Sequence, residues 1–202
     1  MVPSRLPAEH LCFPDAEAAV ELALGIAVVA AIVGLLRGGS LEALAATHFR
    51  AVWLLFGGLA LQLGFDLWSP SWLGSGGALA VVLLSNALVL AWLWLNRRLP
   101  GVLFAVLGLA LNVVVIASNQ AMPVSRAAIE AAGGDSSALP HDLKHEPASG
   151  RTILPWLGDV IPVPGAGVVI SVGDVVLAAG LGLLAYRRTV GEPQEAPASG
   201  RW

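Results

Sequence analysis

The stretch LGDVIPVPGAGVVISVGDVVLAAG, residues 157–180, repeats Gly-Asp-Val at 158–160 and again at 173–175. The second copy lies in an apolar run that otherwise predicts a membrane-spanning helix over 165–186. Asp174 stands within this run, and an ionised side chain at mid-membrane costs about 2.5–3.5 kcal/mol. Such residues mostly face a cavity or a partner, so the stretch predicts both a helical membrane fold and a candidate site.

The composition of the whole chain agrees with a membrane protein. Of its 202 residues, 56% are hydrophobic and 12% are charged, whereas soluble domains carry about 25% charged residues. A net charge of −3 gives no basic footprint for nucleic acid, and the single cysteine excludes an intrachain disulfide framework. We therefore expect an all-α integral membrane protein whose first partner is the lipid bilayer.

Apolar runs of about 20 residues predict about five transmembrane helices. They cover 16–36, 50–68, 78–95, 101–119 and 165–186. We expect an outer N-terminal segment at 1–15, a membrane bundle over 16–186 and a disordered cytoplasmic tail at 187–202. The outer loop 120–164 interrupts the bundle and should contain short helical pieces, one of which starts near Ser125 and stops at Gly133.

Basic residues predict the orientation of the bundle. Arginines lie in the first loop, in the third loop and after the last helix, whereas the loop 120–164 holds more acids than bases. Because basic residues collect on the cytoplasmic side, the amino terminus should face outward and the carboxyl terminus inward. The expected location is a bacterial plasma membrane, crossed several times.

Polar side chains within the predicted helices gather in the outer half of the bundle. Small residues recur on the same helix faces, which favours close helix packing with amides bonded across the interface. The candidate ligand-binding residues are Gln62, Asn86, Asn112, Asn119, Asp159, Ser171 and Asp174. They predict a polar outer-leaflet pocket covered by the loop 120–164, and the alternative is that these side chains only hold the helices together.

Candidate chemistry beyond binding is weaker. His141 and His145 are four residues apart and could ligate a metal, but a solvated loop is the favoured interpretation and no cofactor is indicated. Asp159 and Asp174 could form a carboxylate pair for acid–base catalysis, although no nucleophile motif or phosphate-binding loop accompanies them. Whether the protein is an enzyme stays open, and the pattern leans against it.

Four motifs together resemble a bacterial family of multi-pass membrane proteins of unknown function. They are LLRGGSLEALA at 35–45, SNQAMPVS at 118–125, WLGDVIPVP at 156–164 and SVGDVVLAAG at 171–180. The resemblance implies a bacterial membrane protein and no established activity. The preferred function is outward-facing binding of a small ligand, ion or lipid headgroup. The alternatives are an accessory subunit of a larger membrane complex and a membrane-embedded enzyme that uses Asp159 and Asp174. The expected protein partners are further copies of this chain or a larger membrane complex.

Overall fold

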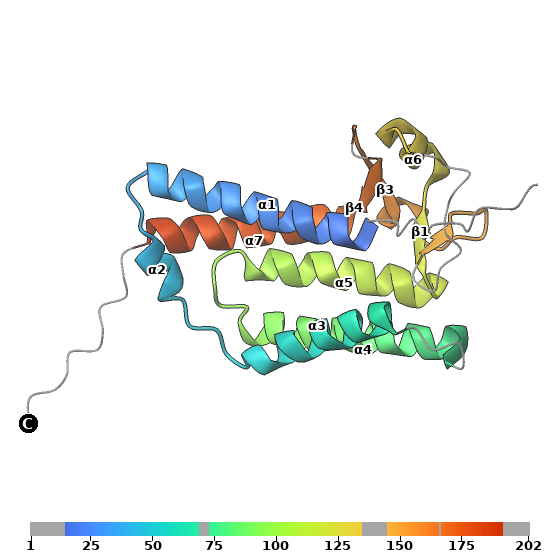
Figure 1. Cartoon of the computed structure of the whole chain (residues 1–202), viewed down its shortest axis with the longest axis horizontal. Coiled ribbons are helices and arrows are strands. Elements are labelled where there is room, and N and C mark those ends of the chain that lie inside the picture. The colour runs from blue at the N-terminus through green and yellow to red at the C-terminus, as the bar shows by residue number, and fades with distance from the viewer. Residues whose placement is uncertain (1–14, 69–72, 135–144, 166, 192–202) are drawn as a thin grey trace, which may run out of the picture.

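The computed structural model describes residues 15–68, 73–134, 145–165 and 167–191 (Figure 1). The chain is mostly helical and carries a small sheet between its last two long helices. The helices are α1 (Asp15–Leu36), α2 (Leu41–Ala45), α3 (Val52–Leu67), α4 (Gly74–Leu95), α5 (Val102–Asn119), α6 (Arg126–Ala132), η3 (Pro155–Leu157) and α7 (Val172–Val190). The strands are β1 (Met122–Val124), β2 (His145–Pro147), β3 (Asp159–Val163) and β4 (Val168–Ser171).

The five long helices lie side by side in the order α1, α7, α5, α4, α3 (Figure 1). The last helix in the sequence thus lies between the first helix and α5. A core of buried residues joins α4, α5 and α7, and it includes Trp92, Leu93, Ala105 and Leu184. The sheet and α6 cover one end of the bundle, and α2 lies at the opposite end (Figure 1).

Glycines bring α7 into close contact with α5. The backbone carbonyls of Gly173 and Gly180 lie where a Cβ on Gly108 or Gly101 would have to stand. The predicted small-residue face of 101–119 therefore does pack against α7. Close backbone approach of this kind is typical of helix pairs in membranes.

The opposite face of α7 packs against α1. A Cβ on Gly34 would meet the side chain of Thr189, and one on Gly182 would meet Ile26. Ala178, Gly182 and Ala185, the small residues that repeat along α7, are all buried. Both flanks of α7 are therefore closed by neighbouring helices.

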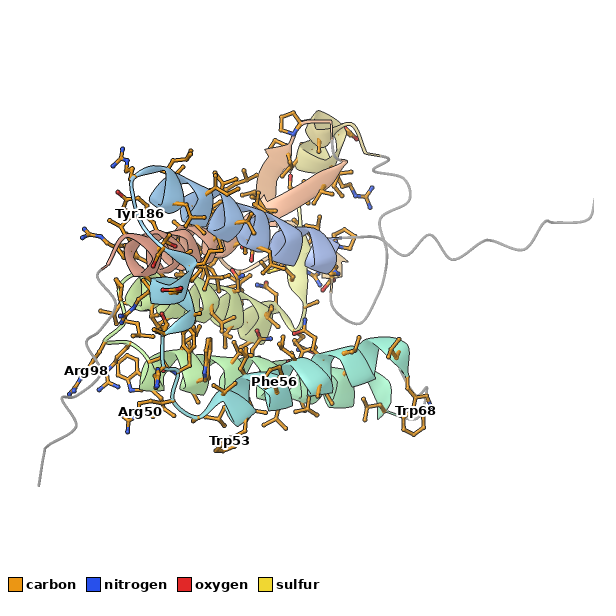
Figure 2. All side chains as sticks on the ribbon, turned by 60° about the vertical axis from the view of Figure 1, so that its left-hand side comes forward. Arg50, Trp53, Phe56, Trp68, Arg98 and Tyr186 are labelled. Carbon is orange, nitrogen blue, oxygen red and sulfur yellow. The ribbon has the colours of Figure 1, made fainter. Side chains whose placement is uncertain are left out.

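Two helices, α4 and α5, are long and apolar enough to cross a membrane. Shorter apolar stretches occupy Leu22–Leu36 of α1 and Val52–Phe65 of α3. Only 22% of the apolar window of α4 and 28% of that of α5 is buried. The large side chains of Trp53 and Phe56 are exposed, and that of Trp53 points away from the bundle (Figure 2). An apolar exterior of this extent is unlike that of a soluble monomer; the number of spans and their direction stay predictions.

The all-α prediction is wrong where four short segments, 122–124, 145–147, 159–163 and 168–171, form strands. The strand order is β2-β1-β3-β4, with β1 parallel to β2 and β3, and β3 antiparallel to β4. The strand sequences DVIPV and VVIS are rich in β-branched residues, which suit a pleated backbone. Gly165 and Gly167 have φ of +78° and +67° in the β3–β4 connection, a conformation that ends regular helix or strand there.

This connection also moves the start of the last helix. The helix predicted over 165–186 begins at Val172, because residues 168–171 form β4. It also ends later, at Val190, so residues 187–190 are helical and not part of a tail. The predicted segments 1–14 and 192–202 lie outside the described residues.

The short helix predicted within residues 120–164 is confirmed. Ser125 is the N-cap of α6 and its Oγ accepts a hydrogen bond from the Ala128 amide at 3.3 Å. Gly133, with φ of +87°, ends the helix. Buried Ile129 packs with Val124 and Val169, which fastens α6 to the sheet.

Candidate functional site

Ser171 and Asp174 form the junction between β4 and α7. Ser171 is the N-cap of α7, and its Oγ accepts from the Asp174 amide at 3.0 Å. The Asp174 carboxylate in turn accepts from the Ser171 amide at 2.9 Å through Oδ2. This reciprocal arrangement is a capping box, which satisfies backbone donors that a helix start leaves unbonded. Asp174 is therefore in the first turn of its helix, and not two turns into it as the sequence predicts.

Asn112 of α5 completes a three-residue network. Its Nδ2 donates to Oδ1 of Asp174 at 2.7 Å, and its Oδ1 lies 2.9 Å from the Ser171 hydroxyl. The same hydroxyl is 2.7 Å from Oδ2 of Asp174, so its single hydrogen has two acceptors within reach. Ser171 is fully buried, and the network joins α5 to α7 at the sheet end of the bundle.

Asp159 lies at the same junction. It is the cross-strand partner of Ser171 in the β3–β4 pair and is 5% exposed. Its backbone carbonyl accepts from the Ser125 amide at 3.0 Å, which links β3 to the start of α6. The two Gly-Asp-Val copies thus meet in space: one begins the strand that pairs with the N-cap residue of α7, and the other lies in the first turn of that helix.

The remaining candidates lie apart from this network. Asn119, at the end of α5, forms a pair of hydrogen bonds with the Ile153 backbone, at 2.9 Å to the carbonyl and 2.8 Å from the amide. Asn86 on α4 donates to the Val82 carbonyl of its own helix at 2.8 Å. Gln62 is half-buried on α3, at the far side of the bundle from α7.

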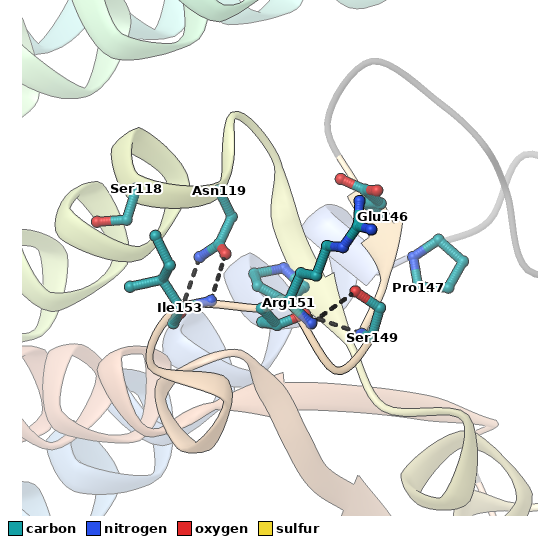
Figure 3. A pocket seen from close by; sticks show the side chains of 9 residues that line it. Ser118, Asn119, Glu146, Pro147, Ser149, Arg151 and Ile153 are labelled. Carbon is teal, nitrogen blue, oxygen red and sulfur yellow. Dashed lines mark hydrogen bonds between the residues drawn. The ribbon is translucent and has the colours of Figure 1, made fainter.

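A polar cavity of about 210 Å³ opens beside Asn119 (Figure 3). Its lining comes from the end of α5, from β1 and β2, and from the loop that follows β2. The residues are Ser118, Asn119, Pro123, Glu146, Pro147, Ser149, Arg151, Thr152 and Ile153. Two hydrogen bonds shape the loop: the Ser149 amide donates to Oγ1 of Thr152 at 2.8 Å, and the Arg151 amide to Oγ of Ser149 at 3.3 Å. Glu146 and Arg151 give this cavity one side chain of each charge.

Most of this cavity was not predicted from the sequence. Asn119 is the one predicted site residue in its lining. Glu146, Ser149, Arg151 and Thr152 belong to a polar stretch that sequence patterns describe only as loop. The available signal was the polarity of 145–152 between two strands, and it does not single out any one side chain.

The proposed histidine pair falls partly outside the structure. His141 is not among the described residues, and His145 lies in β2. Within the described ranges, no three His, Cys, Asp or Glu side chains come together as metal ligands would. The described residues therefore add no third ligand to the proposed histidine pair.

Comparison with known proteins leaves the biochemical role open. No curated protein and no solved structure matches this chain. A family model matches residues 46–186, which begin after α2 and run to the last turn of α7, so the LLRGGSLEALA motif lies outside the matched part. Since this match covers more than half of the sequence, the chain belongs to DUF5317, a family of unknown function.

Proposed function

We propose that the protein crosses a bacterial plasma membrane several times and binds a small polar ligand in the cavity beside Asn119. The observation that carries the proposal is the pairing of an apolar helical bundle with one polar end that holds Glu146 and Arg151. The bundle supplies the membrane anchor and the sheet supplies the binding surface.

The dimensions of the bundle support the membrane part. At 1.5 Å per residue, the 22 residues of α4 extend about 33 Å and the 18 residues of α5 about 27 Å, close to the roughly 30 Å of a bilayer core. Exposed apolar side chains on α1 and α3 continue the same surface. In lipid these apolar side chains are not exposed to water, so their exposure on the bundle surface costs no free energy. We therefore place all five long helices in the membrane.

Charge supports the orientation. Arg50 and Arg98 lie at the end of the bundle opposite the sheet (Figure 2). The positive-inside preference puts that end in the cytoplasm and the sheet outside. The cavity beside Asn119 then opens to the exterior, where it has access to solutes.

The cavity favours a ligand with both charges. A volume of about 210 Å³ equals roughly seven water molecules at about 30 Å³ each, which suits a small metabolite. Arg151 offers a guanidinium for a carboxylate, and Glu146 offers a carboxylate for an ammonium group. A free amino acid has both groups, so we take this class as the probe.

The capping network is not proposed as a catalytic site. Both carboxylate oxygens of Asp174 are engaged, one by Asn112 and the other by the N-cap residue. A carboxylate held in this way stabilises a helix start and a helix pair. The acid–base alternative with Asp159 gains no support from this geometry.

The binding proposal is tested by thermal unfolding of the purified full chain in mild detergent with a panel of free amino acids. We expect at least one of them to raise the unfolding temperature, because a ligand that binds only the folded state stabilises it. For Arg151→Ala, the amino acid concentration that gives the same shift should be about tenfold higher or more, because the substitution removes a charge-assisted hydrogen bond. Arg126→Ala is the matched control, because Arg126 is exposed on α6 and does not line the cavity.

Two results would overturn the binding proposal: no amino acid shifts the unfolding temperature of the wild-type protein, or Arg126→Ala loses the shift as fully as Arg151→Ala.

The membrane part has a separate test. After carbonate washing of membranes from expressing bacteria, the protein should stay in the membrane pellet. Release into the supernatant would contradict membrane insertion.

A further inference from the structure

A second hollow lies at the end of the bundle opposite the sheet. Its volume is about 420 Å³, and it forms where α5 begins against the last turns of α7. Its lining is Pro100, Gly101, Leu183, Arg187 and Arg188. Gly101, with φ of +82°, lets the start of α5 lie directly on the Gly180 backbone. The hollow therefore combines an apolar floor with two guanidinium groups.

One arginine of the hollow, Arg188, differs from Arg37 and Arg97 at the same end of the molecule. Arg37 donates to the Tyr186 hydroxyl at 3.0 Å, and Arg97 donates to the Trp94 carbonyl at 2.8 Å while stacking on that indole. By contrast, Nε of Arg188 is buried and has no hydrogen-bond acceptor among the described residues. A buried donor without an acceptor destabilises the structure, so a ligand that supplies an acceptor to this guanidinium would be stabilising.

The charge around the hollow favours the same conclusion. The segments 37–51, 95–102 and 183–191 meet at this end of the bundle through contacts such as the Ser40 amide to the Thr189 carbonyl, 2.9 Å, and the Arg50 amide to Asn96, 2.8 Å. These segments contain six arginines and one carboxylate, that of Glu42. A local field of this sign attracts anions.

Apolar surface continues from the hollow along α5. Leu103 and Phe104, in the first turn of that helix, are exposed. The Phe104 side chain also lies close to Gly180 of α7, so this surface adjoins the floor of the hollow. An anion that binds here would gain from an attached hydrocarbon chain, which a free phosphate lacks.

We propose that this hollow is a binding site for the phosphodiester of an anionic phospholipid in the cytoplasmic leaflet. Arg187 and Arg188 donate to the phosphate oxygens, and the acyl chains follow the exposed face of α5. Guanidinium groups match phosphate oxygens in geometry as well as charge. Basic pockets between helices on the cytoplasmic side recognise anionic headgroups by this chemistry. The site rests on the proposed membrane placement and orientation, but it is separate from the cavity beside Asn119 and does not depend on its ligand.

Native mass spectrometry of the full chain tests the proposal. The protein is purified in mild detergent and exchanged into micelles with equal amounts of phosphatidylglycerol and phosphatidylcholine. We expect wild-type protein to retain phosphatidylglycerol, and Arg187→Gln with Arg188→Gln to retain it about tenfold less or lower still. The matched control is Arg97→Gln with Arg98→Gln, which removes the same charge at the same end but does not line the hollow.

The outcomes separate a site from a general attraction. Equal loss in both double variants, or no loss in either, would overturn the proposal. Glycerol 3-phosphate added in excess distinguishes the source: if it displaces the lipid completely, the site binds soluble phosphate and the lipid assignment is wrong. Because the glutamine variants could fold poorly, Arg187→Lys with Arg188→Lys keeps the charge and removes only the forked donors. This lysine variant should retain an intermediate amount of lipid. Circular dichroism measures the helical content of each variant, so a loss of lipid that is caused by misfolding is recognised.

Discussion

Asp174 holds the start of α7 with both of its carboxylate oxygens. Replacing it with alanine removes the capping box and leaves the Asn112 amide without its acceptor. We expect Asp174→Ala to lower the free energy of unfolding by about 1–3 kcal/mol, the combined scale of a lost cap and a lost partly buried hydrogen bond. The measurement is the unfolding transition in mild detergent, followed by circular dichroism.

Asp174→Asn provides the conservative comparison. An asparagine still offers one carbonyl oxygen to the Ser171 amide, and the Asn112 amide can turn to accept from its new NH₂ group. This variant should therefore lose less stability than the alanine variant. Asn86→Ala is the control, because the hydrogen bond of Asn86 within the described part of the chain is to Val82 of its own helix. Its removal should cost less than about 0.5 kcal/mol. A loss for Asp174→Ala no larger than that for Asn86→Ala would show that the network does not stabilise the helix start.

At the scale of helices, Gly173 sets the distance between α5 and α7. A Cβ at this position would overlap the Asn112 side chain, which is held by hydrogen bonds to Asp174 and Ser171, and the backbone carbonyl of Gly108. We expect Gly173→Ala to destabilise the protein by about 1–3 kcal/mol through overpacking. Gly25→Ala is the matched change on α1, where a Cβ meets no atom within 4 Å. It should be neutral or slightly stabilising, because alanine favours a helix by up to about 1 kcal/mol.

The sequence predicts the helices far better than it predicts the sheet. The long helices follow from apolar runs, and α6 follows from local signals, Ser125 at its start and Gly133 at its end. For residues 159–171 the sequence predicts a loop followed by a helix, because Val and Ile are common both in strands and in membrane helices. The positive φ of Gly167 decides between them, and that is a consequence of tertiary structure.

Across the whole molecule, polarity divides the bundle into two chemically different ends. The expectation that polar groups gather at one end holds for Asn112, Ser171 and Asp174, which share one network. It could not locate the cavity beside Asn119, because that cavity needs the end of α5 and two strands to come together. When two segments far apart in the sequence come together, the hydrophobic periodicity of each segment does not indicate its partner.

The orientation of the whole molecule gives the last prediction. In a Cys12→Ser background, single cysteines replace Gly150, in the loop near the sheet, and Glu42, on α2 at the basic end. Both positions are exposed, so accessibility of the thiol depends on which side of the membrane it occupies. In intact spheroplasts, a membrane-impermeant maleimide should label Gly150→Cys and leave Glu42→Cys unlabelled; after permeabilisation it should label both. The opposite pattern in intact spheroplasts would invert the molecule, and with it the exterior position of the Asn119 cavity and the cytoplasmic position of the arginine-lined hollow. The labelling is decisive because the charge difference between the two ends is the one feature on which both assignments depend.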